Sequence, residues 1–174
     1  TVNSEKEKIY MTSFMRDLYA DIPGIGVRKL NAACANGGAE LCVQTIEENY
    51  QVQIDNYAMV DFNSMADIVE AIGGVELEIS EEEMEHINMR LPEQYKVAGK
   101  GDPVYLDHAG EVWLDGYQAV AYTRDRYTGS TSDFGRTERQ RKLLTAIFEK
   151  VKSDYVETQS TSTLQSLLSY TSHD

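Results

Sequence analysis

The chain has 174 residues, of which 41% are hydrophobic and 26% are charged. This composition suits one globular domain with a core of its own. The formal net charge of −13 makes the molecule as a whole repel nucleic acid and anionic lipid, so we expect no nucleic-acid partner. No apolar run in the sequence approaches the roughly 18–20 residues that a membrane-spanning helix needs.

The first half of the sequence predicts strands and helices in succession. Strands are predicted where β-forming residues alternate with polar ones, from residue 8 to near Ser13, over 56–62 and over 75–80. A helical pattern over 29–50 is broken at Gly37-Gly38, and a second one over 63–74 has Asn63 as its candidate cap. Strands and helices at this spacing indicate an α/β layered fold.

Helices dominate the second half. Ser80 is placed to cap an acidic helix over 80–92, and Gly- and Asp-punctuated residues over 95–116 predict short strands or a hairpin. Residues 117–124 favour a helix over a strand. A long helix is predicted over 133–153, because apolar residues recur there at helical spacing.

The two cysteines, Cys34 and Cys42, do not form a CxxC pair, and no His or Cys pair nearby completes a zinc site. A disulfide across a helical turn is one reading in an oxidising compartment. The alternative interpretation is that both cysteines are reduced and pack as small apolar residues. The sequence does not decide between the disulfide and this alternative.

Positive charge gathers in one stretch of this acidic chain, YTRDRYTGSTSDFGRTERQRK (122–142). Arg124 and Arg126 lie two residues apart and point the same way if the backbone there is extended. On the following helix, Arg136 and Gln140 share a stripe with apolar residues, and Arg139 lies beside them. A buried arginine requires a partner.

An arginine in the first turn of a helix is also repelled by the positive end of the helix dipole. This position is favourable only when an anion lies in front of the helix and balances both positive charges. Several guanidinium groups that face one anion indicate phosphate. The alternative is pairing within the protein, with acids such as Asp17, Asp125, Asp133 and Glu138. That alternative is favoured for Arg141 and Lys142.

Two acids stand near these cations. Asp17 follows Arg16 just past the first predicted strand, at the end of a strand where ligands bind in open α/β sheets. Asp133 opens the long helix. Either carboxylate is a candidate ligand for Mg²⁺ beside a diphosphate, or a candidate general base. The three histidines lie in no triad-like arrangement, so nucleophilic Ser or Cys catalysis is not expected.

Several motifs in this order resemble the LytR-CpsA-Psr family of bacterial cell-envelope proteins, once described as transcriptional attenuators. They are SFMRDLYADIPGIGVRKLNAA (13–33), GG (37–38), DNYAMVDF (55–62), IGGVELEI (72–79), LDGYQAVAYTRDR (114–126) and DFGRTERQR (133–141). The resemblance runs from about residue 8 to residue 152, and the R-x-R pair followed by D-F-x-R-x-x-R-Q is its most specific part.

The resemblance implies a three-layer α-β-α fold with a central mixed sheet, here truncated at the N-terminal strand. It implies a catalytic domain over 1–153 with 154–174 as its C-terminal extension, tethered at the extracytoplasmic face by an N-terminal membrane helix that this chain lacks. The implied reaction moves a polyprenyl-pyrophosphate-linked glycopolymer, of the teichoic acid or capsule type, onto peptidoglycan with Mg²⁺ (or Mn²⁺). A prenyl pyrophosphatase and a non-catalytic envelope regulator are the alternatives.

The resemblance also implies roles for individual residues. Asp17 is expected to be a metal or catalytic carboxylate, Asp133 a helix-capping acid and possible base, and Arg124 a catalytic residue. The expected pyrophosphate ligands are Arg16, Lys29 (with Arg28 as the alternative to it), Arg124, Arg126, Arg136, Arg139 and Gln140. Candidates for the wall of an apolar lipid groove are Ile68, Val69, Leu143, Leu144 and Ile147, although an apolar helical stripe is more often part of the core.

Overall fold

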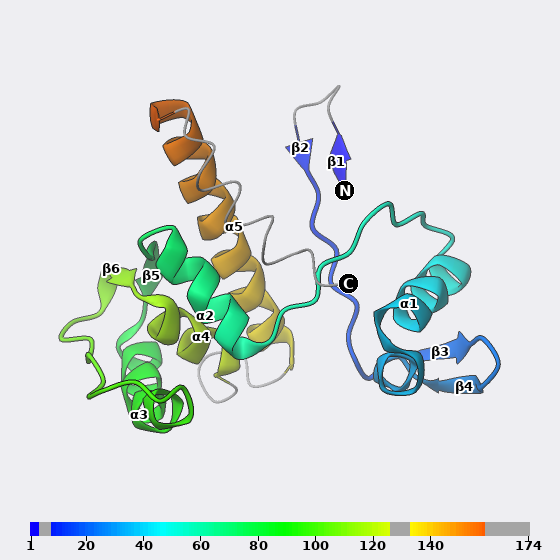
Figure 1. The fold of residues 1–174 in the computed structure, drawn as a ribbon, viewed down its shortest axis with the longest axis horizontal. Helices are drawn as coiled ribbons and strands as arrows, with labels where there is room; N and C mark the ends of the chain where they lie inside the picture. Colours follow the sequence, from blue (N-terminus) through cyan, green and yellow to red (C-terminus); the bar gives the residue numbers. More distant parts are fainter. Residues whose placement is uncertain (4–7, 126–132, 159–174) are drawn as a thin grey trace. The chain divides into compact units, whose positions relative to one another are not determined.

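The computed structural model describes residues 1–3, 8–125 and 133–158. Within it the chain forms two compact units, Thr1–Met59 and Val60–Asp174 (Figure 1). The sequence does not predict this division. The expected boundary after residue 153 stays a prediction, and the last helix runs through that position without a break.

The first unit is a hairpin packed on a helix. Strands β3 (Tyr19–Ile22) and β4 (Gly26–Lys29) pair in antiparallel register and lie beside α1 (Asn31–Tyr50), as Figure 1 shows. Asn49 of α1 fixes the contact: its Oδ1 accepts from the Asp21 N–H at 2.9 Å, and its Nδ2 donates to the Asp21 carbonyl at 2.9 Å. Ile22, Ala33 and Thr45 are buried between them.

Two predictions for this unit have different outcomes. The break at Gly37-Gly38 is confirmed, because α1 has non-helical torsions at both residues and φ is +65° at Gly38. The strand predicted from residue 8 to near Ser13 is confirmed only at its start: β2 spans Lys8–Ile9, where it pairs with β1 (Val2–Asn3), and residues 10–15 form no strand. The side chains of residues 10–13 are exposed, so tertiary packing does not hold an extended backbone there.

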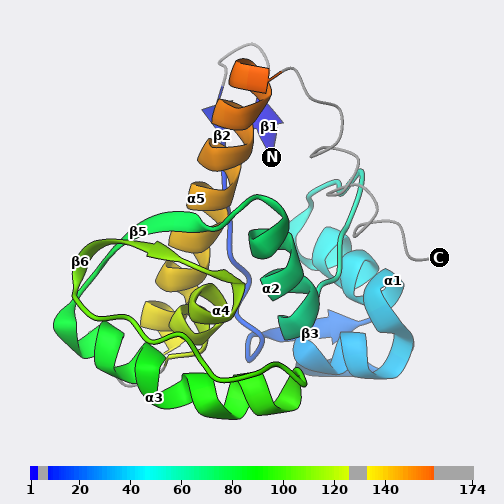
Figure 2. The ribbon, with the colours of Figure 1, turned by 60° about the vertical axis from the view of Figure 1, so that its left-hand side comes forward.

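The second unit contains an antiparallel strand pair surrounded by helices. Its elements are α2 (Phe62–Ala71), β5 (Val75–Ile79), α3 (Glu81–Val97), β6 (Gly110–Leu114), α4 (Gly116–Arg124) and α5 (Asp133–Thr158). Figure 2 shows α5 running along β5 and α4, and α4 also packs on α2 and α3. The core between these elements includes the fully buried Val69, Leu91, Leu114, Tyr122 and Leu143.

The mixed α/β fold class is confirmed, with a difference in the sheet. The described strands pair as three separate two-stranded ladders and form no single central mixed sheet. The strand predicted over 56–62 is also wrong, because those residues form no ladder and α2 begins at Phe62. Among the described helices none is long and apolar enough to cross a membrane.

Caps set the helix starts. Ser80 and Glu83 form a reciprocal capping box at α3, as do Asp115 and Gln118 at α4. Asp61, and not the predicted Asn63, caps α2, by accepting from the Ser64 N–H at 2.8 Å. Because Asp61 precedes the helix by one residue, it has the extended backbone that a cap requires.

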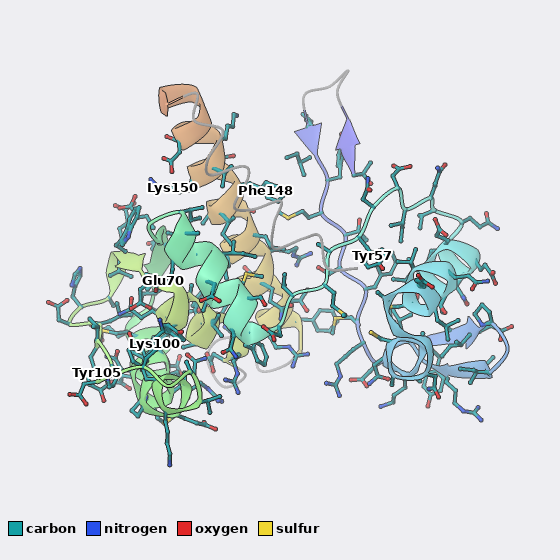
Figure 3. All side chains as sticks on the ribbon, viewed as in Figure 1. Tyr57, Glu70, Lys100, Tyr105, Phe148 and Lys150 are labelled. Atoms are coloured by element: carbon teal, nitrogen blue, oxygen red, sulfur yellow. The ribbon has the colours of Figure 1, made fainter. Side chains whose placement is uncertain are left out.

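The helices α2 and α4 approach closely at a glycine. A Cβ atom on Gly116 would lie 2.2 Å from the Ala66 carbonyl oxygen, so only glycine fits there. The Gly116 N–H also donates to Glu70 Oε1 at 2.9 Å, and Glu70 lies on α2 in Figure 3. This contact fixes the start of α4, and therefore the direction in which α4 carries Arg124 at its other end.

Candidate functional site

In the first unit, three of the expected site residues meet at one place, which we call the Asp17 cluster: Arg16, Asp17 and Lys29. Lys29 Nζ lies 3.1 Å from Asp17 Oδ1, and Arg16 Nε lies 3.6 Å from Asp17 Oδ2. The Asn31 N–H donates to the Arg16 carbonyl at 3.0 Å, which ties the turn to the start of α1. All three side chains are exposed to solvent, so an anion can reach both cations.

In the second unit, Arg124 ends α4 and lies over an aromatic ring. Its guanidinium carbon is 4.6 Å from the ring centroid of Phe62, the first residue of α2. Phe62 is 56% exposed, although phenylalanine is usually buried. The cation–π contact holds the guanidinium at the surface without neutralising its charge.

Phe62 stands between two cavities, which share Phe62 and Asp61. The first, of about 450 Å³, is mostly apolar and is called the apolar groove below. It is lined by Val60, Asp61, Phe62, Met65, Thr123, Gln140, Leu143 and Leu144. The second, of about 300 Å³, is more polar, and Arg124 lies in its wall with Asn63, Glu93 and Gln94. An arginine therefore stands next to a groove that can accept hydrocarbon.

The apolar groove has some of the walls that the sequence predicts. Leu143 and Leu144 line it. Ile68, Val69 and Ile147 do not line it; they are buried in the core, which is the more usual place for an apolar helical stripe. Helix periodicity alone does not separate core from groove, because both require apolar side chains on one face. Phe62 and Met65 were not predicted at all.

The expected ligands on α5 separate into two groups. Gln140 lines the apolar groove, and the half-buried Arg136 precedes it by one helical turn on the same stripe. Arg139, by contrast, is only 5% exposed and turns into the protein. Its Nη2 donates to the Asp125 carbonyl at 2.8 Å, and its Nη1 lies 3.5 Å from Glu83 Oε1. This geometry favours a structural role for Arg139 over contact with substrate.

Two expected residues lie outside what the structure describes. Arg126 is not among the described residues, and of Asp133 only the backbone, as the first residue of α5, is described. The backbone at Asp125 is extended, with φ −65° and ψ 135°. An extended backbone at this position is the condition under which Arg124 and Arg126 are expected to point the same way.

The described residues hold no group of three or more His, Cys, Asp or Glu side chains able to bind a metal ion. Mg²⁺ at phosphate sites is commonly held by one or two carboxylates and completed by phosphate oxygens and water. Asp17 fits such a site as one protein ligand, with the remaining ligands supplied by a substrate.

Cys34 and Cys42 are free thiols on either side of the kink in α1. Partial burial raises the pKa of Cys42, and the charge of a Cys34 thiolate nearby raises it further. A raised pKa keeps Cys42 protonated and unreactive at neutral pH.

The described residues thus place an arginine beside an apolar groove on a mixed α/β scaffold, the two kinds of surface that an amphipathic anion requires. Comparison with known proteins identifies the family. The chain belongs to the LytR_cpsA_psr family, whose family model matches residues 1–174.

Two curated relatives are teichoic acid transferases by name. One is the polyisoprenyl-teichoic acid–peptidoglycan teichoic acid transferase TagU of Enterococcus faecalis, 36% identical over 154 residues, 88% of this chain and 45% of the relative. The other, TagT of Bacillus subtilis, is 34% identical over 153 residues, 88% of this chain and 44% of the relative.

A solved structure of TagT with bound octaprenyl pyrophosphate lipid is similar in fold. It superposes with a TM-score of 0.61 at 31% identity, and the match covers 80% of this chain and 52% of that one. The chain thus spans about half the length of the relatives that it matches.

Proposed function

We propose that this chain binds a glycopolymer linked to a polyprenyl diphosphate and takes part in its transfer to peptidoglycan. The observation that carries the proposal is the placement of Arg124 over Phe62, at the edge of the apolar groove. A prenyl diphosphate has these two needs, a cation for its head and an apolar surface for its chain. The printed names of TagU and TagT, and the lipid bound to TagT, support the same substrate class.

The groove and the arginine act on different parts of the substrate. Burial of hydrocarbon against Leu143, Leu144 and Met65 contributes about 0.8 kcal/mol for each buried CH₂ group. Arg124 can donate two parallel hydrogen bonds to phosphate oxygens, and the Gln140 amide can donate another from the groove. Arg136, one turn from Gln140, adds positive charge to the same stripe.

The proposed reaction is a phosphoryl transfer. A hydroxyl oxygen of peptidoglycan attacks the phosphorus that carries the glycopolymer. The bond from that phosphorus to the bridging oxygen breaks, its electrons stay on the prenyl monophosphate that leaves, and the hydroxyl proton passes to a base. Negative charge spreads over the phosphate oxygens during transfer, and arginines already in place stabilise it.

The Asp17 cluster supplies the second part of the proposal. Its carboxylate is a candidate base for the hydroxyl proton and a candidate ligand for Mg²⁺ (or Mn²⁺), which would neutralise phosphate charge when bound. Arg16 and Lys29 lower the electrostatic cost of placing phosphate oxygens near that carboxylate. Asp133 remains the alternative base. The proposed location is the extracytoplasmic face of a bacterial membrane, where a prenyl-linked glycopolymer would be met.

The experiment that tests this function measures binding and products separately. Geranylgeranyl diphosphate is titrated into the chain and into Leu144→Asp, which puts a charge into the apolar groove; we expect at least a tenfold weaker affinity, because a carboxylate beside hydrocarbon is poorly solvated. Glu149→Asp, at an exposed position on the same helix, is the control and should bind normally. Equal affinity in all three proteins would contradict the groove as the lipid site.

Products then separate transfer from hydrolysis. With a lipid-linked glycopolymer and Mg²⁺, transfer requires peptidoglycan and yields a glycopolymer attached to it. Release of prenyl monophosphate in water at the same rate without any acceptor would instead favour a pyrophosphatase.

A further inference from the structure

Between α3, α4 and α5 lies a buried polar network whose residues are not among those that line the apolar groove. Asp125, the residue directly after Arg124, is 1% exposed, and Arg139 of α5 is nearly as buried. Arg139 Nη2 donates to the Asp125 carbonyl oxygen at 2.8 Å and lies 3.7 Å from the Asp125 carboxylate. One guanidinium thus holds both the backbone and the side chain of Asp125, the residue that directly follows α4.

Glu83 extends this network to the start of α3. Its Oε1 lies 3.5 Å from Arg139 Nη1, while its Oε2 accepts from the Ser80 N–H at 3.0 Å in the capping box. His86, one turn further along α3, has its Nδ1 3.8 Å from the Asp125 carboxylate. The capping carboxylate of one helix is therefore linked, through a single arginine, to the residue that follows Arg124.

The phenol of Tyr122 is enclosed by the same network. Burial raises the pKa of Tyr122, the charge of Glu83 raises it further, and Arg139 lowers it. The phenol therefore stays protonated in the folded protein at any ordinary pH. The charges that balance one another here belong to Glu83, Arg139 and Asp125.

We propose that Glu83 and Arg139 are positioning residues that fix the end of α4, so that Arg124 faces the phosphate, and that neither touches the substrate. This inference rests on the proposed function. The reason is geometric: a side chain as long as arginine at a helix end loses its orientation when the last turn frays. The hydrogen bond from Arg139 prevents fraying at Asp125, and Glu83 orients Arg139.

Glu83→Gln is the sharpest test, because glutamine at this position of a capping box still accepts from the Ser80 N–H. It removes the charge that faces Arg139 and leaves the helix cap. We expect a protein with unchanged circular dichroism and an affinity for geranylgeranyl diphosphate about three- to tenfold weaker, the range seen for residues that act through a neighbour.

Two variants of the same helix serve as matched controls. Ser80→Ala weakens the cap but keeps the Glu83 charge, and Glu85→Gln removes an exposed charge. Both should bind geranylgeranyl diphosphate as the parent chain does. Weakened binding in Ser80→Ala equal to that in Glu83→Gln would overturn the proposal, because the cap and not the charge would then matter.

A double-mutant cycle separates positioning from a general structural effect. In an Arg124→Ala background, Glu83→Gln should cause no further loss of affinity, since the group that it positions is gone. An equal loss in both backgrounds would overturn the inference. If Arg124→Ala itself binds normally, the proposed function fails; if Arg124→Ala loses binding and Glu83→Gln does not, only the positioning role fails.

A second variant covers the case in which Glu83→Gln does not fold. Arg139→Lys keeps the charge but cannot reach Glu83 and the Asp125 carbonyl together, and Arg141→Lys, on the exposed face of α5, is its control. We expect Arg139→Lys to weaken the affinity for geranylgeranyl diphosphate as much as Glu83→Gln does. In the Arg124→Ala background, Arg139→Lys should cause no further loss of affinity. Unchanged affinity in folded Arg139→Lys would overturn the proposal.

Discussion

Arg124 is the residue on which the proposed phosphate site depends most. Its guanidinium lies 4.6 Å from the Phe62 ring centroid, at the surface and near the groove. The ring attracts the cation but leaves its N–H groups able to donate to phosphate oxygens. Lysine is not equivalent here, since it lacks the planar fork and stacks less well on a ring.

We therefore expect Arg124→Ala to weaken prenyl diphosphate binding by tenfold or more, because charge-assisted hydrogen bonds contribute about 1.5–3 kcal/mol each. Arg124→Lys should fall between alanine and the parent chain. Isothermal titration calorimetry measures both, with Arg141→Ala as the exposed control. A parent-like affinity in Arg124→Ala would show that the head group binds elsewhere.

Asp61 gives a prediction about pH. Its carboxylate accepts from the backbone of Ser64, and this hydrogen bond lowers the pKa of Asp61 below its ordinary value of 3.8. A lowered folded-state pKa means that the ionised cap stabilises the protein above the unfolded-state pKa, and that this contribution disappears as pH falls through the folded-state value.

Asp61→Ala should therefore lower the melting temperature at pH 7 and change it much less near pH 2.5. Thermal denaturation at both pH values measures the difference. Asp102→Ala, an exposed acid outside any helix start, is the control and should show little effect at either pH. An equal loss for Asp61→Ala at both pH values would mean that its charge does not contribute.

At the scale of single elements, the turn between α2 and β5 depends on glycine. Gly74 has φ +95°, and a Cβ atom there would lie 2.3 Å from Nε1 of Trp113 on the neighbouring strand. The same Nε1 donates to the Gly73 carbonyl at 2.8 Å. Lys150 of α5, labelled in Figure 3, lies over the Trp113 ring at 5.5 Å. The turn, the strand pair and α5 are thus joined at one tryptophan.

Gly74→Ala should accordingly destabilise the fold by about 1–3 kcal/mol, because it combines a strained backbone with a displaced indole. Urea denaturation measures the free energy of unfolding. Gly101→Ala is the control: a Cβ atom there meets nothing within 4 Å, and its effect should stay within about 0.5 kcal/mol. Similar losses in the two variants would contradict the steric argument.

The elements also show what local sequence can and cannot predict. Helices α3 and α4 begin where Ser80 and Asp115 indicate, because a capping box is a local interaction. The segment 56–62 has β-forming residues but no partner strand among the described residues. Pairing depends on distant parts of the chain, and a propensity for strand does not supply it.

Across the whole molecule, burial distinguishes arginines that are accessible to a ligand from an arginine that is paired inside the protein. The sequence places Arg124, Arg136 and Arg139 in one cluster. Burial separates them: Arg139 has Glu83 as its partner, 56 positions away in the chain, and no spacing rule predicts that pair. The motif therefore indicates a phosphate site, but only the structure shows that one of its arginines is buried against Glu83 and Asp125.

The sequence also did not predict the division of the chain into two compact units. The Asp17 cluster belongs to Thr1–Met59, and Arg124 with the groove belongs to Val60–Asp174. Each unit brings together cations of its own within a chain whose net charge is −13. Anion binding at local sites of an acidic protein favours a small phosphorylated ligand over a long polyanion such as nucleic acid.

Native mass spectrometry with added geranylgeranyl diphosphate tests the central claim most directly, on the parent chain and on Arg124→Ala side by side. We expect a complex of one lipid per chain that the parent retains and that Arg124→Ala loses, while both proteins keep the same charge-state distribution. Equal retention by both proteins, or no bound lipid in the parent, would contradict a prenyl diphosphate site built on Arg124.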